Sequence, residues 1–94
     1  MKKIIVGNYL GFCDFSATVK VADEFEHHSI IMIVSIYSDD MIEVAVDRKF
    51  SEALRTILGV KGGFIGCTVE MVKDINQRDV YVMTDLRKLT RKGD

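Results

Sequence analysis

The chain has 94 residues, with 13 lysine or arginine and 14 aspartate or glutamate residues, so its formal net charge at pH 7 is −1. Apolar residues make up 48% and charged residues 29%, a balance that is typical of a globular domain and excludes a disordered chain. The near-neutral charge excludes a protein held on nucleic acid mainly by a large excess of cations. We expect one domain over residues 1–94, with a basic tail over 87–94 that frays at its end.

The first residues have the order of a secretory signal, with charge followed by apolar side chains. Their apolar run, residues 4–6, is far shorter than the about 7–15 residues of a signal. The longest apolar run, residues 30–34, is too short to span a bilayer. Cys13 and Cys67 are too few for a small secreted domain, so we predict two buried, reduced thiols, with one long-range disulfide as the alternative. Together these features predict a cytoplasmic protein without membrane contact.

The first half of the chain is predicted to form strands. Residues 4–6 form an optional first strand, and residues 12–22 alternate between apolar and polar side chains, the pattern of a half-buried strand. Its predicted apolar face carries Cys13, Phe15, Ala17, Val19 and Val21. Residues 23–28 interrupt the pattern and are predicted to form an acidic loop.

A buried strand and a hairpin follow. Residues 29–37 are nearly all apolar and rich in β-branched side chains, which favours a strand covered on both faces. Residues 38–40 form a polar turn, and residues 41–48 alternate again, which predicts a hairpin.

The period then changes to that of a helix. Apolar residues at helical spacing predict a helix over residues 51–58, with Ser51 as its N-cap and Gly59 at its end. After the glycine-rich residues 59–66, alternation resumes around Cys67. A turn over residues 74–79 leads to a last strand over residues 80–86.

The order of these elements predicts the fold class. It is mainly β with one short helix, and strand–strand–strand–helix–strand–strand is the order of the OB-fold. We therefore expect an OB-like antiparallel Greek-key barrel of five or six strands, depending on whether residues 4–6 form a separate strand. A small open α+β sheet is the alternative. No residue motif identifies a family.

Motifs for catalysis, metals and cofactors are missing. His27 and His28 are adjacent and the cysteines are isolated, so zinc-ligand spacing is absent and two exposed loop histidines are expected. Burial would make both thiols inert. The glycines of residues 59–66 match no phosphate-binding motif and follow a helix, so a tight barrel corner explains them better. We predict no metal, no cofactor and no enzymatic activity.

Nucleic-acid binding remains as a specific possibility. OB-folds bind single strands in a groove that combines cations with aromatic rings. The candidate residues are Tyr37, Arg48, Lys49, Lys61, Phe64, Lys73, Arg78 and Tyr81. Residues 76–78 would form one ligand-facing loop, but residues 23–28 would form the other, and their acids repel phosphate. Aromatic residues in strands are also more commonly part of a core.

Two function classes follow from these observations. The favoured one is a protein-interaction or assembly module that binds another protein or itself, because the charge is near zero and the apolar content is high. The apolar strand over residues 30–36 would supply its edge or face. The alternative is an OB-like protein that binds single-stranded nucleic acid.

Overall fold

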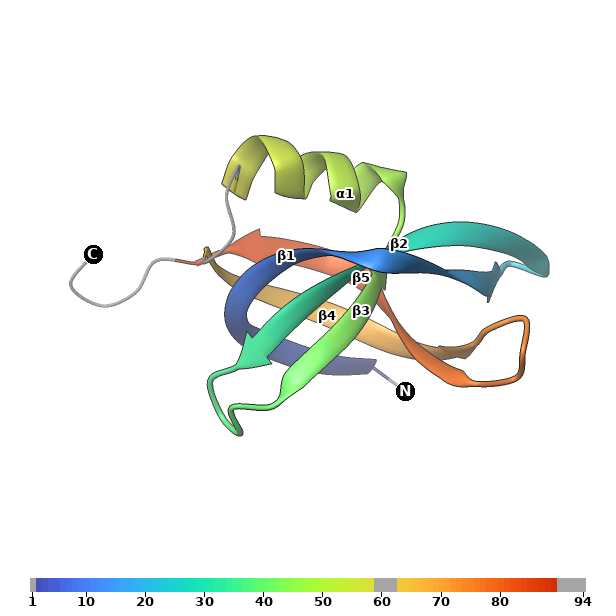
Figure 1. Ribbon diagram of the computed structural model, residues 1–94, viewed down its shortest axis with the longest axis horizontal. Coiled ribbons are helices and arrows are strands. Elements are labelled where there is room, and N and C mark those ends of the chain that lie inside the picture. The colour runs from blue at the N-terminus through green and yellow to red at the C-terminus, as the bar shows by residue number, and fades with distance from the viewer. Residues whose placement is uncertain (1, 59–62, 90–94) are drawn as a thin grey trace.

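The computed structural model describes residues 2–58 and 63–89, which form strands and one helical segment (Figure 1). In chain order the elements are β1 (Lys2–Val21), β2 (Glu24–Ser35), β3 (Met41–Val46), α1 (Arg48–Ala53), its π-helical continuation η1 (Leu54–Leu58), β4 (Phe64–Lys73) and β5 (Asp79–Lys88). The predicted order of strands and helix is confirmed.

The five strands form a closed barrel in the order β1-β2-β3-β5-β4. The predicted OB-like fold is therefore correct, whereas the open sheet and the six-stranded barrel are wrong. The expectation of purely antiparallel pairing is also wrong, because β3 and β5 are parallel, with Val44 beside Tyr81 and Ala45 beside Val82. A ring with an odd number of strands cannot alternate direction throughout, so one parallel pair is unavoidable.

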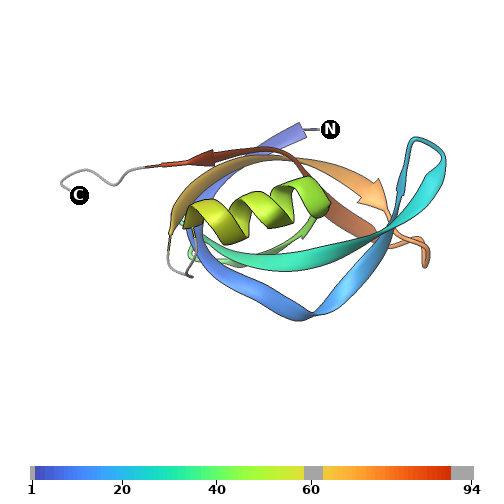
Figure 2. The same ribbon diagram turned by 90° about the horizontal axis from the view of Figure 1, so that it is seen from above.

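Strand β1 is long enough for its two halves to pair with different neighbours in the barrel. Residues 2–8 pair with β4, and residues 7–21 pair with β2, so residues 4–6 belong to this strand. Its register shifts twice, once beside Gly11, which has a φ of 114°, and once between Phe12 and Ser16. Figure 2 shows the resulting bend. Because the second shift interrupts the alternation, Phe15 is exposed instead of lying on the predicted apolar face.

The predicted acidic loop over residues 23–28 is instead the start of a strand. The turn consists only of Ala22 and Asp23, both with positive φ, and Glu24 already pairs with Val21. Positive φ at both turn residues matches the type I′ turn of tight hairpins. The expectation of two exposed histidines is wrong for His28, which is buried opposite Ala17, since neighbouring side chains in a strand point to opposite faces.

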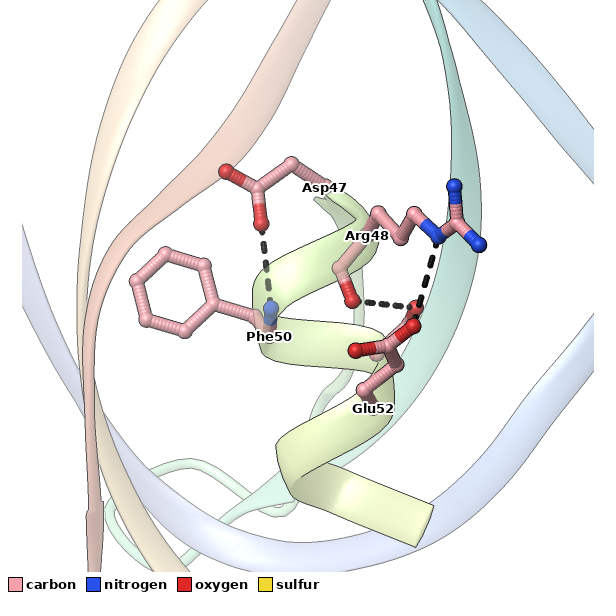
Figure 3. Close-up of polar contacts among 5 residues, drawn as sticks. Asp47, Arg48, Phe50 and Glu52 are labelled. Carbon is pink, nitrogen blue, oxygen red and sulfur yellow. Dashed lines mark hydrogen bonds and ion pairs between the residues drawn. The ribbon is translucent and has the colours of Figure 1, made fainter.

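Helix α1 begins three residues earlier than predicted. Asp47 is its N-cap, and its carboxylate accepts a hydrogen bond from the backbone N–H of Phe50 at 3.0 Å (Figure 3). Ser51, the predicted N-cap, lies within the helix, where its hydroxyl donates to the carbonyl of Arg48 at 3.1 Å. Leu54 is fully buried in the core. The predicted helix end at Gly59 lies outside the described residues.

Two apolar clusters lie on opposite faces of β2 and β3. Ile31 and Val44 belong to the larger cluster, together with Leu54 from the helical segment. Their neighbours Ile30 and Ala45 belong to the smaller one. The predicted burial of residues 29–37 on both faces is confirmed within β2, but the strand ends at Ser35, and Ile36 and Tyr37 are exposed. Because β2 lies between β1 and β3, it supplies no free edge.

The last strand continues into the predicted tail. Arg87 and Lys88 belong to β5 and pair with Gly66 and Ile65. Residues 90–94 of the tail lie outside the described residues. Over the described part of the chain, no helix has the length and apolar character needed to cross a membrane.

Candidate nucleic-acid interface

A groove of about 510 Å³ opens beside the bend of β1. Its walls come from that bend, from the first residues of β3 and from the turn between β4 and β5. The turn is attached to β1, because the backbone N–H of Ile75 donates to the carbonyl of Thr18 at 2.9 Å. In Figure 1 this turn and the turn between β1 and β2 lie at the same end of the barrel. The volume is within the range of about 300–1,000 Å³ that is usual for ligand sites.

The groove has an apolar floor and aromatic walls. Ile30, Ala17 and Val80 are lining residues that belong to the smaller apolar cluster or pack against it. Phe15 is 56% exposed. Tyr81 also lines the groove but is half-buried, because it packs against the larger apolar cluster, and the ammonium of Lys3 lies 5.5 Å from its ring centroid. Exposed ring surface beside an apolar floor is suited to a flat ligand that stacks.

The charges around the groove are mostly paired. Asp74 is buried, and its carboxylate accepts backbone N–H bonds from Asn76 at 2.8 Å and Arg78 at 2.9 Å. The hydrogen bond from Arg78 is the largest cause that holds the pKa of Asp74 below its ordinary value. Asp79 forms an ion pair with Lys73. The side chains of Lys73 and Arg78, which are paired with Asp79 and Asp74, are both more than half exposed. Each can therefore exchange its carboxylate partner for a phosphate at little cost.

The candidate residues from the sequence do not form one cluster. Arg78 and Tyr81 line the groove, and Lys73 lies next to it through its ion pair with Asp79. The other described candidates lie outside the lining: Tyr37 in the β2–β3 turn, Arg48 and Lys49 at the start of α1, and Phe64 at the start of β4. Lys61 lies outside the described residues.

The sequence analysis missed most of the lining residues, among them Phe15, Met41 and Glu43. Phe15 was assigned to the core because a register shift cannot be read from alternation. Gly11 signals only the first shift of β1, since glycine within a strand commonly marks a bulge, and no such residue marks the shift between Phe12 and Ser16. Met41 and Glu43 line the groove because β3 and β5 pair at only two positions, which the sequence does not reveal.

Neither cysteine has the low pKa that a nucleophilic thiol needs. Both are free, with Cys67 buried and Cys13 half-buried. Burial raises the pKa of Cys67 to about 12, and burial together with Glu43 and Asp14 raises that of Cys13. Among residues 2–58 and 63–89, no three His, Cys, Asp or Glu side chains gather closely enough to hold a metal ion.

Comparison with known proteins supports the fold assignment. No protein-family model matches the sequence, and no curated protein sequence matches it significantly. Two crystal structures of the mitochondrial single-stranded DNA binding protein Rim1 from S. cerevisiae are similar to the chain. One has a TM-score of 0.62 at 16% identity and covers 97% of this chain and 95% of the other. The second crystal form has a TM-score of 0.57 at 15% identity, with 97% of each chain covered.

Proposed function

We propose that this protein binds single-stranded nucleic acid and that the groove receives its bases. The observation that carries the proposal is that nearly the whole chain follows the fold of Rim1, which is described as a single-stranded DNA binding protein. The groove supports it, because the exposed ring of Phe15 and the exposed cation of Arg78 both line it. Stacking on aromatic rings combined with phosphate contacts is how OB-folds hold single strands.

A binding function without catalysis fits this site better than an enzymatic one. Asp74 is occupied by backbone hydrogen bonds, and Asp79 is paired with Lys73. The raised pKa values of Cys13 and Cys67 disfavour the thiolate that nucleophilic catalysis requires. The groove therefore offers surfaces for recognition and no activated group.

Fluorescence anisotropy of a labelled single-stranded oligonucleotide tests the proposal. At low salt we expect saturable binding that weakens as salt rises, because cations that contact phosphate displace condensed counterions. The unlabelled single strand should compete, and a duplex of the same sequence should compete poorly, because paired bases cannot enter the groove. Absence of binding at low salt contradicts the proposal.

Self-association is a second candidate function, and one surface favours it. On the outer face of β1, Ile4 is 71% exposed, and Val6 lies near Gly66 of β4. Leu89 packs onto the same glycine, so apolar side chains from three segments meet on this face. Size-exclusion chromatography with light scattering tests it: Ile4→Lys should shift an oligomer toward monomer, whereas a monomeric wild-type protein excludes this candidate.

A further inference from the structure

Glu43 differs from the other carboxylates that line the groove. Asp74 is bonded to the backbone of its own turn, and Asp79 is paired with Lys73. Glu43 is exposed and has no hydrogen-bond or ion-pair partner within residues 2–58 and 63–89. The groove therefore presents one acceptor group that is available to a ligand.

The register places this carboxylate over the apolar floor. Ala45 pairs with Ile30 on one side and with Val82 on the other, and all three belong to the smaller apolar cluster. Glu43 is two residues earlier on β3, so its side chain points to the same face as Ala45. A hydrogen bond made beside apolar side chains is stronger than one made in bulk water. The position favours recognition by a directed hydrogen bond.

The charge of Glu43 restricts what enters the groove. An unpaired carboxylate repels phosphate, so the phosphate backbone must remain at the rim, where Arg78 and Lys73 are exposed. The part that enters must be flat enough to stack on the exposed ring of Phe15 and must offer an N–H group. A nucleobase with an exocyclic amino group satisfies both requirements.

We infer that Glu43 makes the groove selective for bases that carry an exocyclic amino group, with cytosine preferred over uracil and thymine. This inference rests on the proposed single-strand binding. The amino group N4 of cytosine donates to a carboxylate, which is an established pairing for Glu and Asp in base recognition. Uracil and thymine present a carbonyl oxygen at the same position, and two acceptors facing each other repel.

Oligonucleotides of deoxycytidine and deoxyuridine provide the test, because their bases differ at this edge and lack the methyl group of thymine. We would measure anisotropy at low salt with labelled 12-mers of each, about the length that one OB-fold covers. The wild-type protein should bind the deoxycytidine strand about tenfold more tightly, which corresponds to one good base contact.

Two variants with the same change in charge separate recognition from general repulsion. In Glu43→Gln the amide can either accept or donate a hydrogen bond, so the ratio of the affinities for the deoxycytidine and deoxyuridine strands should fall toward one. The deoxyuridine strand should bind this variant more tightly than it binds the wild-type protein. Glu24→Gln removes an exposed carboxylate at the start of β2, outside the groove, and should retain the preference. Equal urea midpoints for the three proteins show that folding is unchanged.

The outcomes distinguish a failure of the base preference from a failure of single-strand binding. Saturable binding of both strands with equal affinity, or a preference that survives Glu43→Gln, overturns the inference and leaves the proposed function in place. If neither strand binds the wild-type protein at low salt, the proposed function fails and the inference fails with it. A preference lost in Glu43→Gln and retained in Glu24→Gln supports both.

Discussion

Asp74 and Arg78 are joined by three contacts across the turn between β4 and β5. The backbone N–H of Asp74 donates to the carbonyl of Arg78 at 2.9 Å, and the backbone N–H of Arg78 donates to Oδ1 of Asp74, also at 2.9 Å. Nε of Arg78 lies 3.5 Å from Oδ2 of the same carboxylate. These contacts close the turn and hold the arginine at the rim of the groove.

Replacing Asp74 should make stability less sensitive to acid. The native contacts hold its pKa below the ordinary value near 4, so its ionised form stabilises the fold at neutral pH. That contribution is lost as pH falls through the lowered pKa. Asp74→Asn should therefore lower the urea midpoint at pH 7, and the difference from wild type should narrow at pH 3. A difference that stays constant with pH contradicts this role.

An exposed aspartate provides the control for this experiment. Asp14 is exposed on β1 and forms no hydrogen bond through its side chain and no ion pair with the described residues. Asp14→Asn removes the same charge without disturbing a turn. We expect its urea midpoint to follow that of wild type at both pH values.

The turn between β1 and β2 contains a strained residue. Ala22 has a φ of 49°, a conformation that alanine adopts only at a cost of about 1–2 kcal/mol. Asparagine tolerates this region, so Ala22→Asn should raise the free energy of unfolding by about 1 kcal/mol. Ala22→Val should lower it, because a β-branched side chain fits the region poorly. Urea unfolding measures both, and the same sign for both variants would argue against strain at this position.

Two glycines of the barrel differ in how they tolerate a methyl group. A Cβ on Gly7 would overlap the backbone carbonyl of Val34, whereas one on Gly66 would lie 3.1 Å from Cδ1 of Leu89, a side chain that can move. Gly7→Ala should therefore destabilise the protein by about 1–3 kcal/mol or more. Gly66→Ala should cost clearly less. Equal urea midpoints for the two variants would show that β1 and β2 are less closely packed than described.

The two thiols should report on folding. With its pKa raised to about 12, Cys67 is a thiolate in only about 1 in 10,000 molecules at pH 8, and burial blocks access to it. Reaction with a thiol reagent should therefore be slow in buffer and rapid in urea. In Cys13→Ser, which leaves Cys67 alone, the native protein should barely react. Rapid native labelling of that variant would mean that the strands around Cys67 open frequently.

Periodicity predicted those parts of the fold that depend on local alternation. Residues 29–37 were assigned to a strand buried on both faces, and the structure places Ile30 and Ile31 in two different clusters. The β1–β2 turn was missed because Ala22 and Asp23 lack the Asn-Gly signature that normally marks such a turn. The helix start was missed because Ser51 and Asp47 can both act as N-caps. Only packing of the first turn decides between them.

The candidate site was less predictable than the fold. Arg78 and Tyr81 were found because cations and aromatic rings near strand ends are visible in the sequence. Glu43 was not found, since its position in the groove depends on which strand lies beside β3 in the closed barrel. Phe15 was wrongly assigned to the apolar face because the register of β1 shifts between Phe12 and Ser16. Long-range pairing and bulges determine the groove, and neither leaves a clear periodic signal.

Phe15 and Phe25 form a matched pair for testing the groove. Both are aromatic, and both are about half exposed, at 56% and 53%, but only Phe15 lines the groove. Stacking of one base is worth about 1–3 kcal/mol, so Phe15→Ala should weaken single-strand binding by about 5-fold to 140-fold. Phe25→Ala should change the affinity less than about twofold.

Stability measurements make the comparison of these two variants specific. Because both side chains are exposed, each substitution should change the free energy of unfolding by no more than about 0.5 kcal/mol. Loss of binding in Phe15→Ala at unchanged stability then assigns the loss to the ring surface in the groove. Equal losses of affinity in both variants would place the bases elsewhere, because Phe25 lies outside the groove lining.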